Sequence, residues 1–154
     1  MQKSNTVLIA VGILVFIGAA ALLIWKKPFS RPVNTTTNVT AEKLPEKFPV
    51  DVPLEEGAKI LKNYNSVSPE GRVQASRVFE SNRSVAANFD LYRNFLTDRQ
   101  NGWTVVYELN NPSQPAYKAI FARRTDGVLN VTIRSSTQER ASIVDVSFLA
   151  SESN

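Results

Sequence analysis

The order of apolar and polar residues divides the chain into one long apolar run near its start and a patterned region after position 48. In that region, alternating apolar and polar positions, or runs of β-branched and aromatic residues between turn signals, predict strands. The predicted strands are residues 58–65, 72–81, 103–109, 116–124, 128–135 and 141–150. Asp126-Gly127 is a strong signal for a tight turn between two of them.

One segment, residues 84–100, has the period of a helix. Its apolar stripe consists of Val85, Phe89, Tyr92 and Leu96. We expect Phe89 and Leu96 to be its deepest anchors. Ser84 is placed to cap the N-terminus, and Gly102 suits the left-handed conformation that often ends a helix. Asn88 falls inside the apolar arc, where we expect it to be hydrogen-bonded or peripheral.

These elements predict an α+β domain over residues 48–150. The expected order is ββ-α-βββ, a small twisted antiparallel sheet with one helix packed on one face. A stripe of alternating residues follows the helix, namely Trp103, Val105, Tyr107 and Leu109. We expect this stripe to pack under the helix, and the alternative is a platform for a ligand.

The apolar run begins at Val7 and ends at Trp25, with no charged residue between them. As a helix it would be roughly 28 Å long, close to the thickness of the hydrocarbon core of a bilayer. Trp25 suits the headgroup level, and Lys26 follows it directly. We therefore expect a single transmembrane helix over residues 7–25, preceded by a short tail, with the lipid bilayer as a partner.

A cleaved signal peptide is the alternative for this run, because Lys3 and the small residues Ala19-Ala20-Ala21 match its pattern. Apolar regions of signal peptides are typically about 7–15 residues long, so the length favours a retained anchor. The positive-inside rule, applied to the basic residues after the run, favours a cytoplasmic domain. The spacer that follows is typical of exported domains, and we expect an extracytoplasmic domain on that ground.

The spacer is the basic flank and stalk at residues 26–47, which is rich in Pro, Thr and Asn. Such a composition does not bury a core, so we expect a linker between membrane and domain. Residues 151–154 are expected to be a disordered tail. The folded domain, residues 48–150, is expected to be a monomer.

The residue composition excludes several kinds of catalytic and metal-binding site. The chain has 154 residues, 18 Lys and Arg, 14 Asp and Glu, and neither His nor Cys. Thiol nucleophiles, imidazole bases, His or Cys zinc sites and disulfides are therefore excluded. All of the excess positive charge lies within residues 1–40, so the domain carries no net charge to attract nucleic acid. Glu55 and Glu56 are neighbours on an extended segment and make a poor acid–base pair. We expect no cofactor and no metal.

Two motifs resemble a known group. Phe48-Pro49-Val50-Asp51-Val52-Pro53 and the following Gly57-Ala58 match the pattern FPxDVPxxxGA, and the helix runs into Asn101-Gly102-Trp103. Together they are similar to a family of uncharacterised bacterial envelope proteins that carry a signal sequence, a lipobox or an N-terminal anchor. The resemblance implies export and an α+β domain, and it carries over no catalytic residue. Because this chain lacks the lipobox Cys, the apolar helix would be the anchor.

The sequence thus predicts a single-pass, non-catalytic membrane-tethered module that binds an envelope protein or polymer, or is a subunit of an envelope assembly. The alternatives are a small-ligand-binding or enzymatic domain with a pocket between helix and sheet, and a pilin-like subunit. Two polar loops should lie together at one end of the sheet, and loops on a rigid sheet often carry recognition. The candidate partner-binding residues are Asn110, Asn111, Ser113, Gln114, Gln138 and Arg140.

Overall fold

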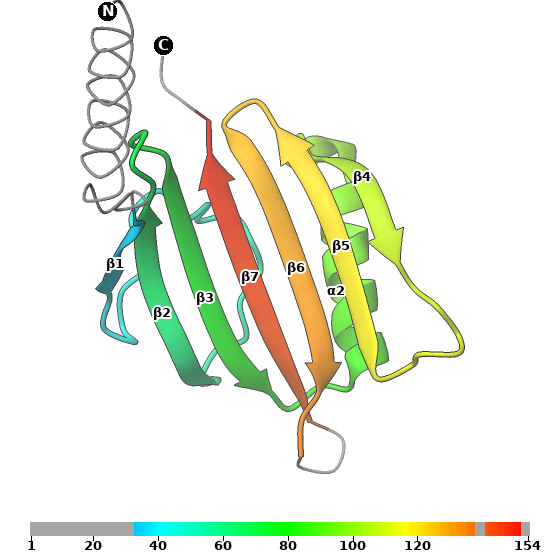
Figure 1. Cartoon of the computed structure of the whole chain (residues 1–154). Helices are drawn as coiled ribbons and strands as arrows, with labels where there is room; N and C mark the ends of the chain where they lie inside the picture. The colour runs from blue at the N-terminus through cyan, green and yellow to red at the C-terminus, as the bar shows by residue number, and fades with distance from the viewer. Residues whose placement is uncertain (1–32, 138–140, 152–154) are drawn as a thin grey trace, which may run out of the picture. The chain divides into compact units, whose positions relative to one another are not determined.

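The computed structural model describes residues 33–137 and 141–151, which form a seven-stranded antiparallel sheet with one α-helix packed on it (Figure 1). The elements are β1 (Thr35–Asn38), β2 (Lys59–Val67), β3 (Val73–Ser81), α2 (Val85–Thr97), the 3-10 turn η1 (Arg99–Asn101), β4 (Thr104–Leu109), β5 (Tyr117–Arg124), β6 (Gly127–Ser135) and β7 (Ser142–Ala150). The strand order across the sheet is β1-β2-β3-β7-β6-β5-β4. The predicted α+β class is confirmed.

The predicted order ββ-α-βββ is wrong in its number of strands. Four strands, β4 to β7, follow the helix, and each lies on a segment that the hydrophobic pattern marks as a strand. The other addition is β1, which pairs with the outer edge of β2. Its sequence, Thr-Thr-Thr-Asn, has no apolar alternation, and all four residues are exposed. The pattern that predicts strands is absent from it because β1 buries no side chain.

The position of β1 also corrects the predicted stalk. Residues 33–47 belong to the compact unit Val33–Asn154, so the folded unit begins earlier than position 48. The amide nitrogen of the buried Asn63 donates to the carbonyl groups of Val39, Thr40 and Lys43, at 3.4, 2.7 and 2.8 Å. This segment is therefore fixed through its main chain rather than through apolar side chains.

A second polar side chain holds the same segment. The guanidinium of Arg77 donates to the carbonyl groups of Lys43 at 3.0 Å and of Ala41 at 2.8 Å. Further along, Phe48 and Val52 are buried in the core that α2 shares with the sheet. The sheet face that carries α2 is thus covered in two halves (Figure 1). Residues 39–57 run over the half formed by β2 and β3, and α2 covers the other half.

Helix α2 begins where the sequence predicts but ends at Thr97, short of the predicted end at residue 100, and the 3-10 turn η1 that follows it ends at Gly102. The hydroxyl of Ser84 accepts from the amide of Ala87 at 3.2 Å, which is an N-cap hydrogen bond. Gly102 has φ 69°, the left-handed conformation that only glycine adopts at little cost. Phe89 and Leu96 are 2% and 0% exposed, so both are deep anchors, as expected.

Asn88 is buried and hydrogen-bonded. Its amide nitrogen donates to the hydroxyls of Ser81 and Ser142, each at 2.8 Å, and both serines are also buried. Ser81 in turn donates to the carboxylate of Glu55. This network joins the start of α2 to the end of β3, to the start of β7 and to residues 39–57, which we call the lead-in segment, and it satisfies the polar groups that are buried there.

The predicted membrane span from Val7 to Trp25 lies outside the described residues. Within 33–137 and 141–151, no helix is long and apolar enough to cross a bilayer.

Candidate binding surface on the open face of the sheet

One face of the sheet carries α2, and we call the opposite face the open face, since no described helix or strand packs on it. Figure 1 looks onto the open face, with α2 behind β5 and β6. Side chains alternate between the two faces along each strand. On β5, Ile120 and Ala122 are fully buried against the helix, whereas Tyr117 and Phe121 are exposed on the open face.

A β-bulge in β4 brings a second aromatic side chain to the open face. The register between β4 and β5 shifts between Val105 and Tyr107, so that Tyr107 lies directly opposite Phe121. Trp103 is buried as predicted, but Tyr107 is 59% exposed. The expectation that the whole stripe packs under the helix is therefore wrong for Tyr107 and Leu109, because the extra residue, Val106, reverses the alternation.

The result is a cluster of apolar side chains on the β4–β5 half of the open face. We call it the open-face patch, and it consists of Tyr107, Leu109, Tyr117, Ala119 and Phe121. Its three aromatic residues are 59%, 39% and 38% exposed in that order. Directly opposed side chains of neighbouring strands lie about 5 Å apart at Cβ, so these residues form a continuous surface.

Basic side chains border the open-face patch. Arg134 on β6 lies directly opposite Tyr117, and Arg123 on β5 is two residues beyond Phe121 on the same face. Both arginines are exposed. Aromatic rings beside guanidinium groups provide large apolar contact area and charge-assisted hydrogen bonds, the combination that dominates the binding energy of many protein interfaces.

The centre of the open face is polar. Asp145 on β7 is half-buried, and burial raises the pKa of its carboxyl, although a hydrogen bond from Ser147 at 3.0 Å and the charges of Lys62 and Arg134 act in the opposite direction. The hydroxyl of Ser147 lies 2.9 Å from that of Ser76 on β3. A partly desolvated carboxylate thus lies on the same face as the open-face patch, with β6 between them.

The two polar loops lie at the same end of the sheet, as the antiparallel direction of the strands requires. Residues 110–116 connect β4 to β5, and residues 136–141 connect β6 to β7. The end of the first loop and the start of the second are joined by a hydrogen bond from the amide of Ser135, the last residue of β6, to the carbonyl of Ala116, at 2.9 Å. Tyr117 directly follows the first loop, and Arg134 lies one residue before the end of β6, where the second loop starts. The open-face patch therefore begins at the end of the sheet that carries both loops.

The candidate residues of the first loop are all exposed. Asn111 shapes the loop, because its side chain accepts from the amide of Ser113 at 2.9 Å and its carbonyl accepts from the amide of Gln114 at 2.9 Å. Asn110 accepts from the ammonium of Lys118, which also lies 4.9 Å from the ring centre of Phe89. The loop is thus tied back to the helix side of β5.

Of the second loop, Gln138 and Arg140 lie outside the described residues. The structure therefore brings together Asn110, Asn111, Ser113 and Gln114 but leaves the contribution of the second loop as a prediction. The open-face patch was not among the candidate sites of the sequence. Its signal was present, since Phe121 alternates with two buried residues, but the assignment of Tyr107 depends on a bulge that the period-two pattern does not show.

A metal site and a ligand pocket under the helix find less support in the structure than the open-face patch does. Among the described residues, no group of three or more Asp and Glu side chains could hold a metal ion. The space between α2 and the sheet is filled by fully buried side chains, including Tyr92, Leu96 and Ile120.

Comparisons of the chain with protein-family models, with curated proteins and with solved structures give no match.

Proposed function

We propose that this chain is a non-catalytic binding module, tethered to a bacterial envelope membrane by the apolar segment from Val7 to Trp25, and that it binds a partner protein through the open-face patch. The observation that carries this proposal is the exposure of three aromatic side chains, Tyr107, Tyr117 and Phe121, on a sheet face that no other described element covers.

The composition of the surface favours a protein partner over a small ligand. Tyr107 and Phe121 stand on neighbouring strands of the open face, and Arg134 and Arg123 flank them. Small molecules are usually bound in concave pockets that bury most of their surface. The alternative of a ligand pocket between helix and sheet is disfavoured, because Phe89 and Leu96 occupy that space.

The binding surface is tested by capture of partners from native membranes with the full chain. We expect the double substitution Tyr107→Ser and Phe121→Ser to abolish capture of the partners that the unaltered chain retains. Val50→Ser is the matched control, because Val50 is an apolar residue that is 86% exposed and lies away from the open face. We expect this control to keep all partners.

A second variant tests the contribution of the first loop separately from that of the open-face patch. Replacing residues 110–115 with a short Asn-Gly turn removes the candidate loop residues and leaves the patch in place. We expect this replacement to weaken capture less than the double substitution does. Loss of partners on loop replacement alone would move the site to the loops, and unchanged capture by the double variant with an intact fold would refute the open-face patch.

The membrane tether needs its own test. Protease protection on intact cells and on spheroplasts reports the compartment of the domain. We expect digestion of the domain in spheroplasts and protection in intact cells, because we propose an extracytoplasmic domain. Protection in both preparations would place the domain in the cytoplasm, as the basic residues after the apolar segment favour.

A further inference from the structure

The outer edge of β2 is only partly occupied. β1 pairs with residues 64–67 of β2, and no described strand lies beside residues 59–62 on that side. The last main-chain link is the hydrogen bond from the amide of Val39 to the carbonyl of Asn63, at 2.8 Å. Within the part of the chain that the structure describes, four residues of strand edge, about 13 Å in length, therefore have no neighbouring strand.

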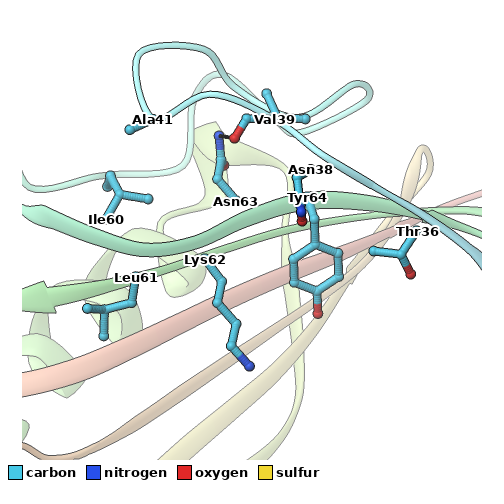
Figure 2. Close-up of a pocket in the computed structure, with 9 residues that line it drawn as sticks. All are labelled: Thr36, Asn38, Val39, Ala41, Ile60, Leu61, Lys62, Asn63 and Tyr64. Carbon is cyan, nitrogen blue, oxygen red and sulfur yellow. Dashed lines mark hydrogen bonds between the residues drawn. The ribbon is translucent and has the colours of Figure 1, made fainter.

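The chain that leaves β1 is held away from this edge. Asn63 and Arg77 bind the carbonyl groups of residues 39–43 on the helix side of the sheet. Between the departing chain and β2 lies a hollow of about 640 Å³. Figure 2 shows this hollow, with Val39, Ala41 and Ile60 on one side of β2 and Lys62 and Tyr64 on the other.

A β-bulge shapes the free edge. The register between β2 and β3 shifts between Ile60 and Lys62, which leaves Leu61 as the extra residue. Figure 2 shows Leu61 on the same side of the strand as Lys62, whereas Ile60 points to the opposite side. Leu61 is 40% exposed. A strand added here would meet apolar side chains on the helix side, and Leu61 together with an ammonium group on the open-face side.

The charges of the edge select among possible occupants. Lys62 is exposed, and the side chain of Lys59 is 73% exposed, with its ammonium 3.6 Å from Glu80. Lysines and bulges on an edge strand discourage pairing between identical edges, because two copies would bring like charges together. A second copy of this chain is therefore disfavoured, and a strand that carries acidic side chains is complementary.

We propose that the free edge of β2 binds an extended peptide segment of a partner protein by strand addition. The peptide has acidic side chains facing Lys62 and aliphatic side chains facing Ile60 and Ala41, so that the two kinds alternate along its sequence. β1 shows that this edge accepts an added strand, since it pairs with the adjoining part of β2. Main-chain hydrogen bonds would supply affinity, and the alternating side chains would supply specificity. This site is separate from the open-face patch and does not depend on it.

The probe is a fluorescent peptide of sequence Gly-Val-Glu-Val-Glu-Val-Gly with blocked ends, titrated with the full chain in detergent micelles and followed by anisotropy. We expect saturable binding, and about tenfold weaker binding of the same peptide with its alternate amides N-methylated, because methylation removes main-chain donors and leaves the side chains unchanged. This comparison needs no altered protein.

A charge reversal then locates the site. We expect Lys62→Glu to weaken binding of the Glu peptide about tenfold and to favour the peptide in which both Glu residues are replaced by Lys. Arg99→Glu is the matched control, because Arg99 is an exposed base on η1, outside the edge. Equal binding of the N-methylated peptide, no binding at millimolar peptide, or no effect of Lys62→Glu would each overturn the proposal.

Discussion

Arg124 lies over the indole ring of Trp103, with its guanidinium carbon 4.2 Å from the ring centre. The same guanidinium binds both carboxylate oxygens of Asp126 at 2.8 Å and Oδ2 of Asp51 at 2.6 Å. The hydrogen bonds to Asp126 raise the pKa of Arg124, and those from Arg124 lower the pKa of Asp126. One side chain thus joins the lead-in segment, the start of β4 and the turn between β5 and β6.

Substitution of this residue tests that junction. Arg124→Lys keeps the charge but removes the planar fork and the contact with the ring. We expect it to lower the free energy of unfolding by about 1–3 kcal/mol, because several hydrogen bonds to charged groups are lost. Urea unfolding measures the change. Arg123→Lys is the control, since Arg123 is exposed, and we expect a change within about 0.5 kcal/mol. Equal effects would show that the junction contributes nothing.

The start of the folded unit gives a second prediction. We expect residues 33–154 to unfold cooperatively and at a higher temperature than residues 48–154. The shorter chain lacks the carbonyl groups that accept from Asn63 and Arg77, and each such hydrogen bond contributes about 0.5–1.5 kcal/mol to stability. Scanning calorimetry compares the two chains. Identical melting temperatures would mean that residues 33–47 add no stability.

The packing of α2 against the sheet gives a third prediction. We expect Phe89→Ala and Leu96→Ala each to cost about 2–5 kcal/mol, because each leaves a cavity in a closed core. Arg93 lies on the exposed side of α2, 3.2 Å from Glu108, and we expect Arg93→Ala to cost about 0.5 kcal/mol. Chemical denaturation provides the three values. Comparable losses at all three positions would mean that α2 is rotated from the orientation described.

The carboxyl group of Asp145 makes the stability of the folded chain depend on pH. Because burial raises its pKa in the folded state, ionisation costs more in the folded chain than in the unfolded one. This cost is absent below the ordinary carboxyl pKa of 3.8 and develops as the pH rises through the pKa of the folded state. We therefore expect Asp145→Asn to be more stable than the unaltered chain at pH 7.

The two chains should become equally stable near pH 3, where the carboxyl is protonated in both states (about one unit below its ordinary pKa). Thermal unfolding across this range measures the difference. An advantage of Asp145→Asn that grows as the pH falls would contradict the raised pKa. The Asn side chain retains an oxygen that accepts from Ser147, so the substitution changes the charge and keeps the hydrogen bond.

The parts of the fold that the sequence predicts are those whose evidence is local. Ser84 and the apolar stripe of α2 lie within one segment and act as expected, and Gly102 takes the expected left-handed conformation, although it ends η1 rather than α2. The strand β1 has no such evidence. Residues 35–38 are in the sheet because the side chains of Asn63 and Arg77, which are distant in sequence, bind the carbonyl groups that follow them. No periodicity in residues 33–47 reports those partners.

The candidate site divides in the same way. The common end of the two polar loops follows from strand direction alone, and the structure agrees. The open-face patch depends on Tyr107, whose face is set by one extra residue in β4. A period-two pattern continues through a bulge without a visible break, so it assigns Tyr107 to the wrong face. The free edge of β2 depends on where β1 ends, which is also decided by tertiary contacts.

The place of β7 in the sheet has a consequence for how the chain folds. β7 is the last strand along the described residues, yet it lies between β3 and β6. Its pairing with β3 brings together residues such as Phe79 and Val144, which are 65 positions apart. Such distant pairing slows folding, because the intervening chain must be ordered before the contact is made. During synthesis, the three-stranded unit β1–β3 and the α2–β6 region each expose an unpaired strand edge until residues 142–150 have emerged. Aggregation of the nascent chain is therefore most probable in that interval, and it ends when β7 closes the sheet.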